Sequence, residues 1–243
     1  MEIYDAIGAG YAGRRRPDPR IGARIDEALG SARTVLNVGA GAGSYESRSR
    51  QVTALEPAWT MIAQRPQDAA PVVQGRAEAL PFAEGAFDAV MAVLTVHHWT
   101  DKALGLAELR RVARDRIVVL TFDPVFRGFW LTDYLPGLIA LDEAQMPPLS
   151  VFEKAWGGAI AVQPVPIPHD SLDGSLCAYW RRPQAYLDPD VRKAISSFWA
   201  LGDVSTSLQR LERDLVSGAW RARYGGLLEK AEMDLGYRLV VVG

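Results

Sequence analysis

Three glycines spaced two residues apart constrain the fold of this chain more than any other feature of its sequence. Gly39, Gly41 and Gly43 come directly after the apolar run at 34–38, which reads Thr-Val-Leu-Asn-Val. A strand that ends in small residues lets the backbone turn sharply, and it leaves bare amides against which a ligand can lie because no Cβ is in the way. The pattern therefore predicts a strand and a ligand-binding turn in an α/β fold. The alternative interpretation is a tight turn that binds nothing.

An acidic residue, Glu56, follows the second short apolar run at 52–55. In doubly wound folds, a carboxylate at the end of the second strand accepts hydrogen bonds from the ribose hydroxyls of an adenosine. Together with the glycines, Glu56 predicts a cofactor of the adenosine type, although Glu56 alone could be a solvated strand end.

Apolar runs alternate with helical patterns through the first half of the chain. A helix is predicted after Asp18, with Ile21, Ile25 and Leu29 on one face and Gly30 at its end. Strands are predicted at 34–38, 52–55, 71–74, 87–94 and 116–122, with a helical turn around 43–50, a short helix at 57–65 and a helix at 101–113. Strands that are apolar on both faces and alternate with helices predict a parallel sheet covered on each side.

The second half has a different character, because 123–134 is rich in aromatic residues and Pro147-Pro148 breaks the chain beyond it. This segment is interpreted as a lid or as an insertion that faces the substrate. Its aromatic residues either wall an acceptor pocket or pack the lid on the core; they are Phe126, Phe129, Trp130 and Tyr134. The rest of the chain predicts an edge strand at 159–166, helices at 189–201 and 207–220, and a last strand at 237–242.

Three further blocks of sequence are similar to one known family. In order they are 74–82, Gln-Gly-Arg-Ala-Glu-Ala-Leu-Pro-Phe; 85–88, Gly-Ala-Phe-Asp; and 94–101, Leu-Thr-Val-His-His-Trp-Thr-Asp. With the glycine block, they resemble the class I S-adenosylmethionine-dependent methyltransferases, in the broad group that includes the ubiquinone and menaquinone biosynthesis enzymes. The resemblance implies a doubly wound, mostly parallel, seven-stranded Rossmann-like sheet with a helical lid after the fifth strand.

The domain organisation expected from this resemblance is a single methyltransferase domain over 1–243. Within it, 1–30 would form an N-terminal arm and helix and 31–122 the cofactor-binding core. The segments 123–158 and about 167–220 would face the substrate, and 237–243 would hold the last strand.

The resemblance also implies S-adenosylmethionine as cofactor and suggests which residues bind it. The glycine loop would pass beneath the methionine part and Glu56 would hold the ribose. The implied cofactor-binding residues are Gly39, Gly41, Gly43, Glu56, Ala77, Glu78, Leu94, Tyr11 and Arg16. One position departs from the family pattern: an aspartate frequently precedes the alanine of the block at 74–82, and this chain has Arg76 there.

Methyl transfer is a displacement that depends mainly on positioning and on exclusion of water, so a general base is optional. His98 and His97 follow the predicted strand at 87–94, at the sheet edge where ligands bind, and either could accept a proton. Strand alternation would place the two on opposite faces. The alternative is that they cap the next helix and shape the pocket. His169 and Asp170 lie in a proline-rich segment that is interpreted as a surface loop.

The composition of the chain limits which partners, metal sites and cellular locations are expected. A net charge of −2 over 243 residues does not favour nucleic acid, and the single cysteine, Cys177, excludes an internal disulfide or a multi-cysteine metal site. No signal peptide and no long apolar segment stand out, so a cytoplasmic protein without membrane contact is expected, acting on a small molecule. Two alternatives stay open: a nicotinamide-dependent dehydrogenase, whose third glycine would fall at Ser44, and a non-catalytic S-adenosylmethionine-binding module. The oligomeric state is open as well.

Overall fold

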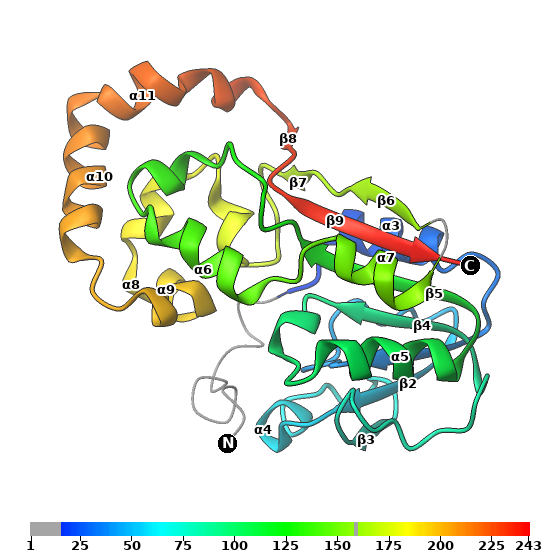
Figure 1. Cartoon of the computed structure of the whole chain (residues 1–243). Helices are drawn as coiled ribbons and strands as arrows, with labels where there is room; N and C mark the ends of the chain where they lie inside the picture. The colour runs from blue at the N-terminus through cyan, green and yellow to red at the C-terminus, as the bar shows by residue number, and fades with distance from the viewer. Residues whose placement is uncertain (1–15, 158–159) are drawn as a thin grey trace.

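The computed structural model describes residues 16–157 and 160–243, and its centre is a seven-stranded sheet (Figure 1). The strand order is β3-β2-β1-β4-β5-β9-β6. The first five strands in the chain run parallel, and β9 lies antiparallel between β5 and β6. Their bounds are β1 Thr34–Val38, β2 Gln51–Glu56, β3 Val72–Gln74, β4 Phe87–Val93, β5 Ala113–Phe122, β6 Ala161–Pro164 and β9 Tyr237–Val242. The predicted Rossmann-like fold is confirmed.

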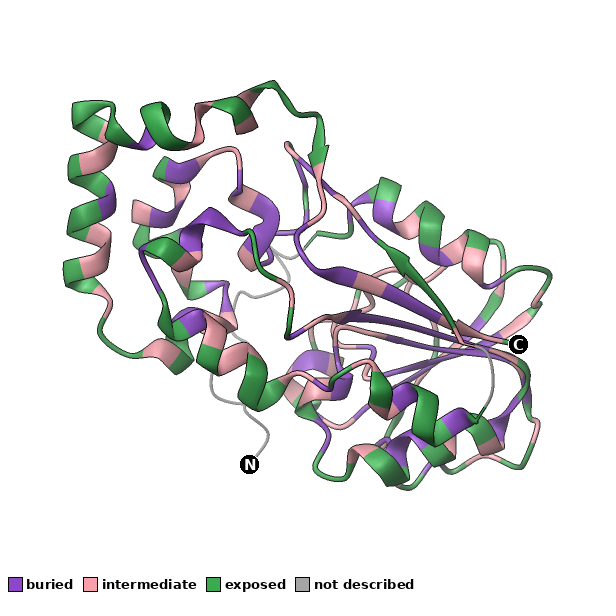
Figure 2. Ribbon diagram, turned by 45° about the horizontal axis from the view of Figure 1, so that its top comes forward, coloured by how far each residue is buried: buried purple, intermediate pink, exposed green. Residues whose placement is uncertain are grey.

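Helices cover both faces of this sheet, and the alternation of side chains along the strands divides the core in two (Figures 1 and 2). On one face, helix α3 (Pro19–Ala28) packs Ile25 among strand residues such as Val35 and Met91. On the other face, α5 (Lys102–Val112) and α7 (Ser150–Trp156) cover Leu36 and Val90. Because β1, β2, β4, β5 and β9 each contribute residues to both clusters, these strands are apolar on both faces.

Local signals explain where the two long helices of the sheet layer begin. The Asp18 carboxylate accepts a hydrogen bond from the Arg20 backbone N–H at 3.0 Å, and Pro19 occupies the first helical position of α3. The Asp101 carboxylate likewise accepts from the Leu104 N–H at 2.9 Å and starts α5. Both helices were predicted from these residues.

The segment after the glycines differs from its prediction. No helix forms at 43–50; the chain makes hydrogen-bonded turns there, with Tyr45 at a φ of 62°. Glu46 is the physical reason, since its carboxylate turns inward to pair with Arg65 and to accept from the Ala70 N–H at 3.1 Å. The predicted helix at 57–65 is also shorter, with α4 spanning only Trp59–Ile62.

A helical cap lies beyond the carboxyl ends of β4 and β5 (Figure 1). Its elements are η2 Trp130–Asp133, α6 Gly137–Gln145, η3 Leu176–Tyr179, η4 Pro183–Leu187, α8 Pro189–Lys193, α9 Ser196–Leu201, α10 Ser205–Ser217, α11 Ala219–Tyr224 and η5 Gly225–Glu229. The two long helices predicted here are each divided. Gly218, at a φ of 81°, separates α10 from α11.

Aromatic side chains hold the cap together. The Trp130 ring meets Trp220 edge-on with 5.3 Å between ring centroids, and its indole N–H donates to the Trp180 carbonyl at 2.7 Å. Phe129 and Tyr134 are buried beside it. Of the two interpretations of this aromatic segment, packing of the lid therefore describes Phe129, Trp130 and Tyr134.

The remaining strands lie at the edge of the large sheet or outside it. Strand β6, exposed along its length, forms the sheet edge as its prolines predicted. A small second sheet pairs β7 (Ile167–Pro168) with β8 (Glu232–Met233) and was not predicted. No helix within the described ranges is long and apolar enough to cross a membrane.

Candidate active site

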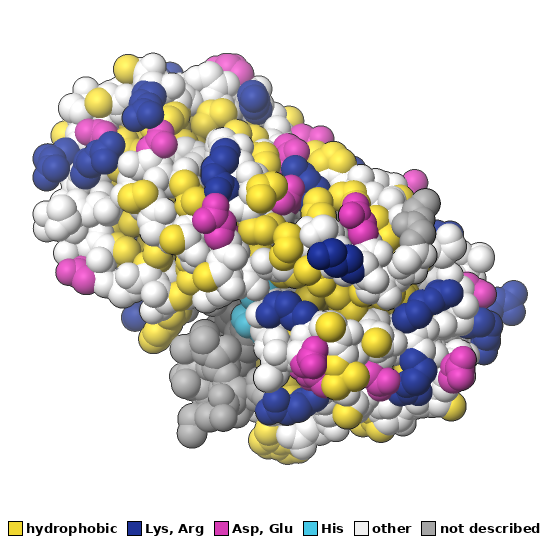
Figure 3. All heavy atoms as spheres, in the orientation of Figure 1, with side chains coloured by type: hydrophobic (Ala, Val, Ile, Leu, Met, Phe, Trp, Pro, Cys, Tyr) yellow, Lys and Arg dark blue, Asp and Glu magenta, His cyan; other side chains and the backbone are white. Residues whose placement is uncertain are grey.

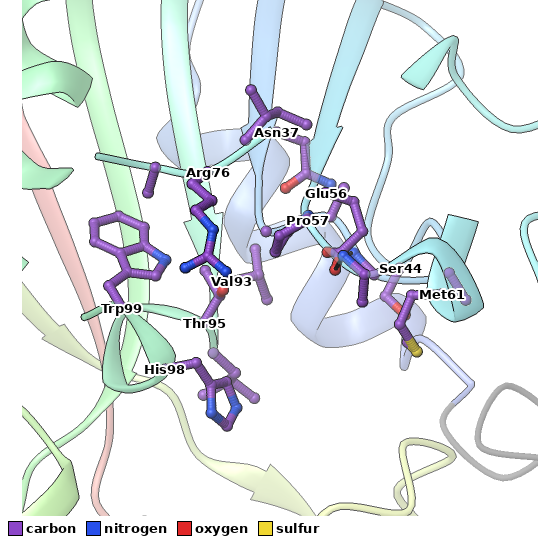
Figure 4. A pocket seen from close by; sticks show the side chains of 18 of the residues that line it. Asn37, Ser44, Glu56, Pro57, Met61, Arg76, Val93, Thr95, His98 and Trp99 are labelled. Atoms are coloured by element: carbon purple, nitrogen blue, oxygen red, sulfur yellow. Dashed lines mark hydrogen bonds between the residues drawn. The ribbon is translucent and has the colours of Figure 1, made fainter. Parts of the chain in front are cut away.

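A cavity opens where β1, β2 and β4 end, and we call it the first cavity (Figure 4). It lies where the strand order passes from β1 to β4, which is the point at which open α/β sheets bind ligands. The predicted site residues that line it are Gly39, Gly41, Glu56, Ala77, Glu78, Leu94 and His98. The sheet thus brings together residues from four separate segments of the chain.

The glycine loop forms one wall of this cavity. The N–H groups of Gly39 and Ala40 both donate to the Leu55 carbonyl, at 2.8 and 3.0 Å, which fixes the loop against β2. Gly39 has a φ of 69°, and a Cβ there would lie 2.0 Å from Thr95 Oγ1. Only glycine fits that position. Gly43, at a φ of 97°, shapes the turn but does not line the cavity.

Glu56 is held by backbone on two sides. Its Oε2 accepts a hydrogen bond from the Gly41 N–H at 2.8 Å and its Oε1 from the Ala58 N–H at 3.0 Å. The side chain is 6% exposed. Since a carboxylate oxygen has more than one lone pair, these contacts orient Glu56 and leave it able to accept further bonds.

The loop after β3 places its residues at 76–78 in three different surroundings, and two of them, Ala77 and Glu78, were predicted site residues. Ala77 is buried in the wall of the first cavity. The Glu78 carboxylate accepts from the Thr100 N–H at 2.8 Å and the Asp101 N–H at 3.2 Å, so it ties this loop to the start of α5. Arg76, the departure from the family pattern, points into the cavity on the side of Trp99 (Figure 4).

The two histidines face different cavities. Both lie on η1 (Val96–His98), with 3.8 Å between their ring centroids. His98 is exposed at the first cavity, whereas His97 lines a second cavity between the sheet and the cap. Leu94, which has the unusual φ of 51°, lines both. The second cavity is therefore the neighbour of the first.

The N-terminal part of the site is described only in part. Tyr11 lies outside the described residues. Arg16 is exposed and does not line the first cavity. His169 lies near β7, away from both cavities, in agreement with its interpretation as a loop residue.

Several residues of the first cavity were not predicted. Asp173, 5% exposed, accepts a hydrogen bond from the Tyr45 hydroxyl at 2.9 Å across 128 positions of sequence. No sequence signal could have linked that pair. Asn37 did carry a signal, because it is a polar residue inside an apolar strand; it is buried and its amide donates to Glu46 Oε1 at 3.3 Å. Over residues 16–157 and 160–243 no group of three acidic, histidine or cysteine side chains could hold a metal ion.

Comparison with known proteins matches the chain both to a family model and to a solved structure. The family model, described as a methyltransferase domain, matches residues 36–119. The solved structure is that of a putative methyltransferase from an antibiotic biosynthesis pathway of Anabaena variabilis. It is 32% identical, the match covers 95% of this chain and 99% of that one, and the two superpose with a TM-score of 0.86.

Two curated proteins match over shorter stretches. The rice chloroplastic 2-methyl-6-phytyl-1,4-hydroquinone methyltransferase 2 is 30% identical over 84 residues, which are 35% of this chain and 24% of its own. The Escherichia coli protein YafE is 43% identical over 64 residues, 24% of this chain and 30% of its own. The matched segments thus span less than a third of either curated relative.

Proposed function

Because the chain belongs to the class I S-adenosylmethionine-dependent methyltransferases, we propose that it transfers the methyl group of S-adenosylmethionine to an oxygen, nitrogen or carbon atom of a small molecule. The observation that carries this proposal is the first cavity, whose wall is a glycine loop and whose rim is Glu56. We further propose one methyltransferase domain over 1–243, acting in small-molecule metabolism in the cytoplasm. On the face shown in Figure 3, acidic and basic side chains are interspersed, so this face suits a small acceptor better than a polyanion.

The residues around the first cavity fit this cofactor. The loop at Gly39 offers backbone where a Cβ would not fit, and Glu56 is held at the strand end as an acceptor for ribose hydroxyls. Both N–H groups that reach Glu78 bind its Oε1, so Glu78 Oε2 or a carbonyl of the loop at 75–77 would accept from the adenine amine. Arg76 and Trp99 supply flat groups that can pack on the adenine ring.

The methionine part of the cofactor carries an ammonium group, which needs an anion. Asp173 is the buried carboxylate beside the glycine loop, and the Tyr45 hydroxyl holds it in place. We propose that Asp173 binds this ammonium group, a charge-assisted contact. Tyr11 and Arg16 remain proposed contacts from the N-terminal arm.

The cofactor would supply an electrophilic methyl group on a sulfonium. The protein would orient the acceptor toward this methyl group and exclude water from the reaction. Leu94 separates the two cavities, so a small molecule in the second cavity would meet the methyl group at this residue. His97 faces the second cavity and is the proposed acceptor of the proton that an attacking hydroxyl or amine releases. His98, exposed at the first cavity, is the second candidate.

The test is calorimetric titration with S-adenosylmethionine and NAD, followed by mass spectrometry of a broad acceptor panel. Glu56→Ala should weaken S-adenosylmethionine binding by at least about tenfold, because contacts to a charged acceptor contribute about 1.5–3 kcal/mol each. Glu212→Ala, an exposed change on α10, is the control. Binding of NAD alone would refute the proposal. Binding of S-adenosylmethionine with no methylated product from any acceptor would point to a non-catalytic module.

A further inference from the structure

The second cavity has a lining of unusual composition. One side is formed by Leu94 and His97 beside the first cavity, and the other by Asp142 of helix α6. Phe122 and Tyr237 contribute aromatic rings. Apolar and small polar side chains complete the wall. A ligand of this cavity would therefore meet both apolar and polar groups, with two aromatic rings and one acidic side chain in the wall.

Asp142 has no cation to pair with in this cavity. Among residues 16–157 and 160–243, the lining of the second cavity includes no lysine or arginine, and no hydrogen bond or ion pair is made by the Asp142 carboxylate. Asp142 also lines an adjoining small cavity together with Arg127, whose charge attracts the carboxylate without forming an ion pair with it. The Arg127 guanidinium is itself engaged, by the Glu143 carboxylate and by the Pro124 carbonyl at 2.8 Å.

Burial has a visible effect on this carboxyl group. It raises the pKa of Asp142 from 3.8 to about 6, and Arg127 only partly opposes the shift. Beside it the Cys177 thiol stays neutral, because burial raises its pKa. At neutral pH the wall of the second cavity therefore carries one negative charge that is only partly solvated.

We propose that the second cavity binds the methyl acceptor and that Asp142 anchors it through a cationic amine, so that the acceptor is a small amine with an apolar or aromatic body. This inference rests on the proposed function. A partly buried carboxylate gains more from a charged N–H donor than from a neutral hydroxyl, since charge-assisted hydrogen bonds are about twice as strong. The rings of Phe122 and Tyr237 suit the body of the acceptor and the positive charge as well.

The proposed contact between Asp142 and a cationic amine predicts how amine binding depends on pH. Asp142 must be ionised to hold a cation, so amine binding should rise as the pH increases through about 6. The other titratable or charged groups that face it are His97 from η1, Cys177 from η3, Tyr237 from β9 and Arg127 from the loop after β5.

The test compares isosteric pairs of amines and alcohols, beginning with phenethylamine and 2-phenylethanol, by calorimetry on the full chain at about pH 8. We expect the amines to bind at least about tenfold more tightly than their alcohols, with Asp142→Asn abolishing the difference. Asp115→Asn, which removes an exposed carboxylate at the other end of the sheet, should leave it unchanged. Equal binding of the two series, no binding of any amine, or an unchanged preference in Asp142→Asn would overturn the inference.

Two further measurements keep the outcomes separate. Asp142→Asn should fold, because a neutral amide removes the cost of burying a charge. At about pH 8 its melting temperature should match or exceed that of the parent protein. This difference in melting temperature should shrink as the pH falls through about 6, where Asp142 of the parent becomes protonated. Titration with S-adenosylmethionine distinguishes the two proposals. Cofactor binding without amine binding overturns only this inference, whereas Asp142-dependent amine binding without methylation overturns the proposed function.

Discussion

Replacing Gly39 by alanine tests whether the glycine loop owes its shape to the absence of a Cβ. Gly39 has a φ of 69°, a conformation that L-residues adopt at a cost. A Cβ built on its backbone would also lie 2.0 Å from Thr95 Oγ1, 2.8 Å from Thr95 Cβ and 2.9 Å from Thr95 Cγ2. All three contacts are shorter than real Cβ atoms tolerate, so the loop or Thr95 must move.

The backbone conformation of Gly39 and the clash of an added Cβ with Thr95 each contribute to the cost of the substitution. The left-handed conformation costs about 1–2 kcal/mol for a residue with a Cβ. Overpacking in a closed site costs about 1–3 kcal/mol more, because Thr95 is itself buried and has little room to shift. Gly39→Ala should therefore lower the free energy of unfolding by about 2–5 kcal/mol. S-adenosylmethionine binding should weaken as well, since any movement of this loop alters the first cavity.

Urea unfolding of a set of variants separates the two contributions. Gly85→Ala is the matched control, because Gly85 has a similar φ of 59° but nothing within 4 Å of an added Cβ. It should show only the conformational cost, about 1–2 kcal/mol. In a Thr95→Gly background the steric part of Gly39→Ala should vanish. The steric explanation is refuted if Gly39→Ala costs no more than Gly85→Ala, or if its cost is the same with and without Thr95.

Two other outcomes are expected from the site and its support. Arg65→Met should lower the free energy of unfolding by about 3–5 kcal/mol, because it leaves the Glu46 carboxylate buried without its cation. The side chains of Arg65 and Glu46 are only 5% and 8% exposed. In urea unfolding, the double variant with Glu46→Leu should recover part of the lost stability. His97→Ala should reduce kcat by about 100-fold or more if His97 accepts the proton, with little change in cofactor affinity, whereas His98→Ala should change kcat less; equal losses would contradict the assignment.

The cofactor half of the molecule is largely predictable from the sequence. Its contacts are short in chain distance: Gly41 and Glu56, joined by a 2.8 Å hydrogen bond, are 15 positions apart and lie at the ends of adjacent strands. Strand patterning alone places such residues at one sheet edge, because parallel neighbours end together. His97 and His98 line different cavities, but both lie on η1 beyond the end of β4, so the strand alternation from which this was predicted does not apply to them.

The predictions that were wrong have identifiable physical causes. Helix propensity could not foresee that Glu46 would pair with Arg65 and leave 43–50 as turns, because both residues lie in loops, whose positions strand patterning does not fix. The break at Gly218 between α10 and α11 lay inside an apolar helical pattern that runs on to Trp220. Asp173 and its bond to Tyr45 depend on the packing of the cap on the sheet, which periodicity does not encode.

The two halves of the site differ in a way that bears on how a chain of this fold could change its acceptor. The first cavity is built mainly from strand ends and the loops after them, with Asp173 as a contribution from the cap side. Beyond Leu94, His97 and Phe122, the second cavity takes its lining from the cap and from β9, including Asp142. Asp142 lines the second cavity and not the first, so a substitution there should alter acceptor choice without altering cofactor affinity. Leu94 lines both cavities, and its φ of 51° makes it the position where that independence should fail: Leu94→Gly, which relaxes the backbone there, should change both affinities together when each is measured by calorimetry.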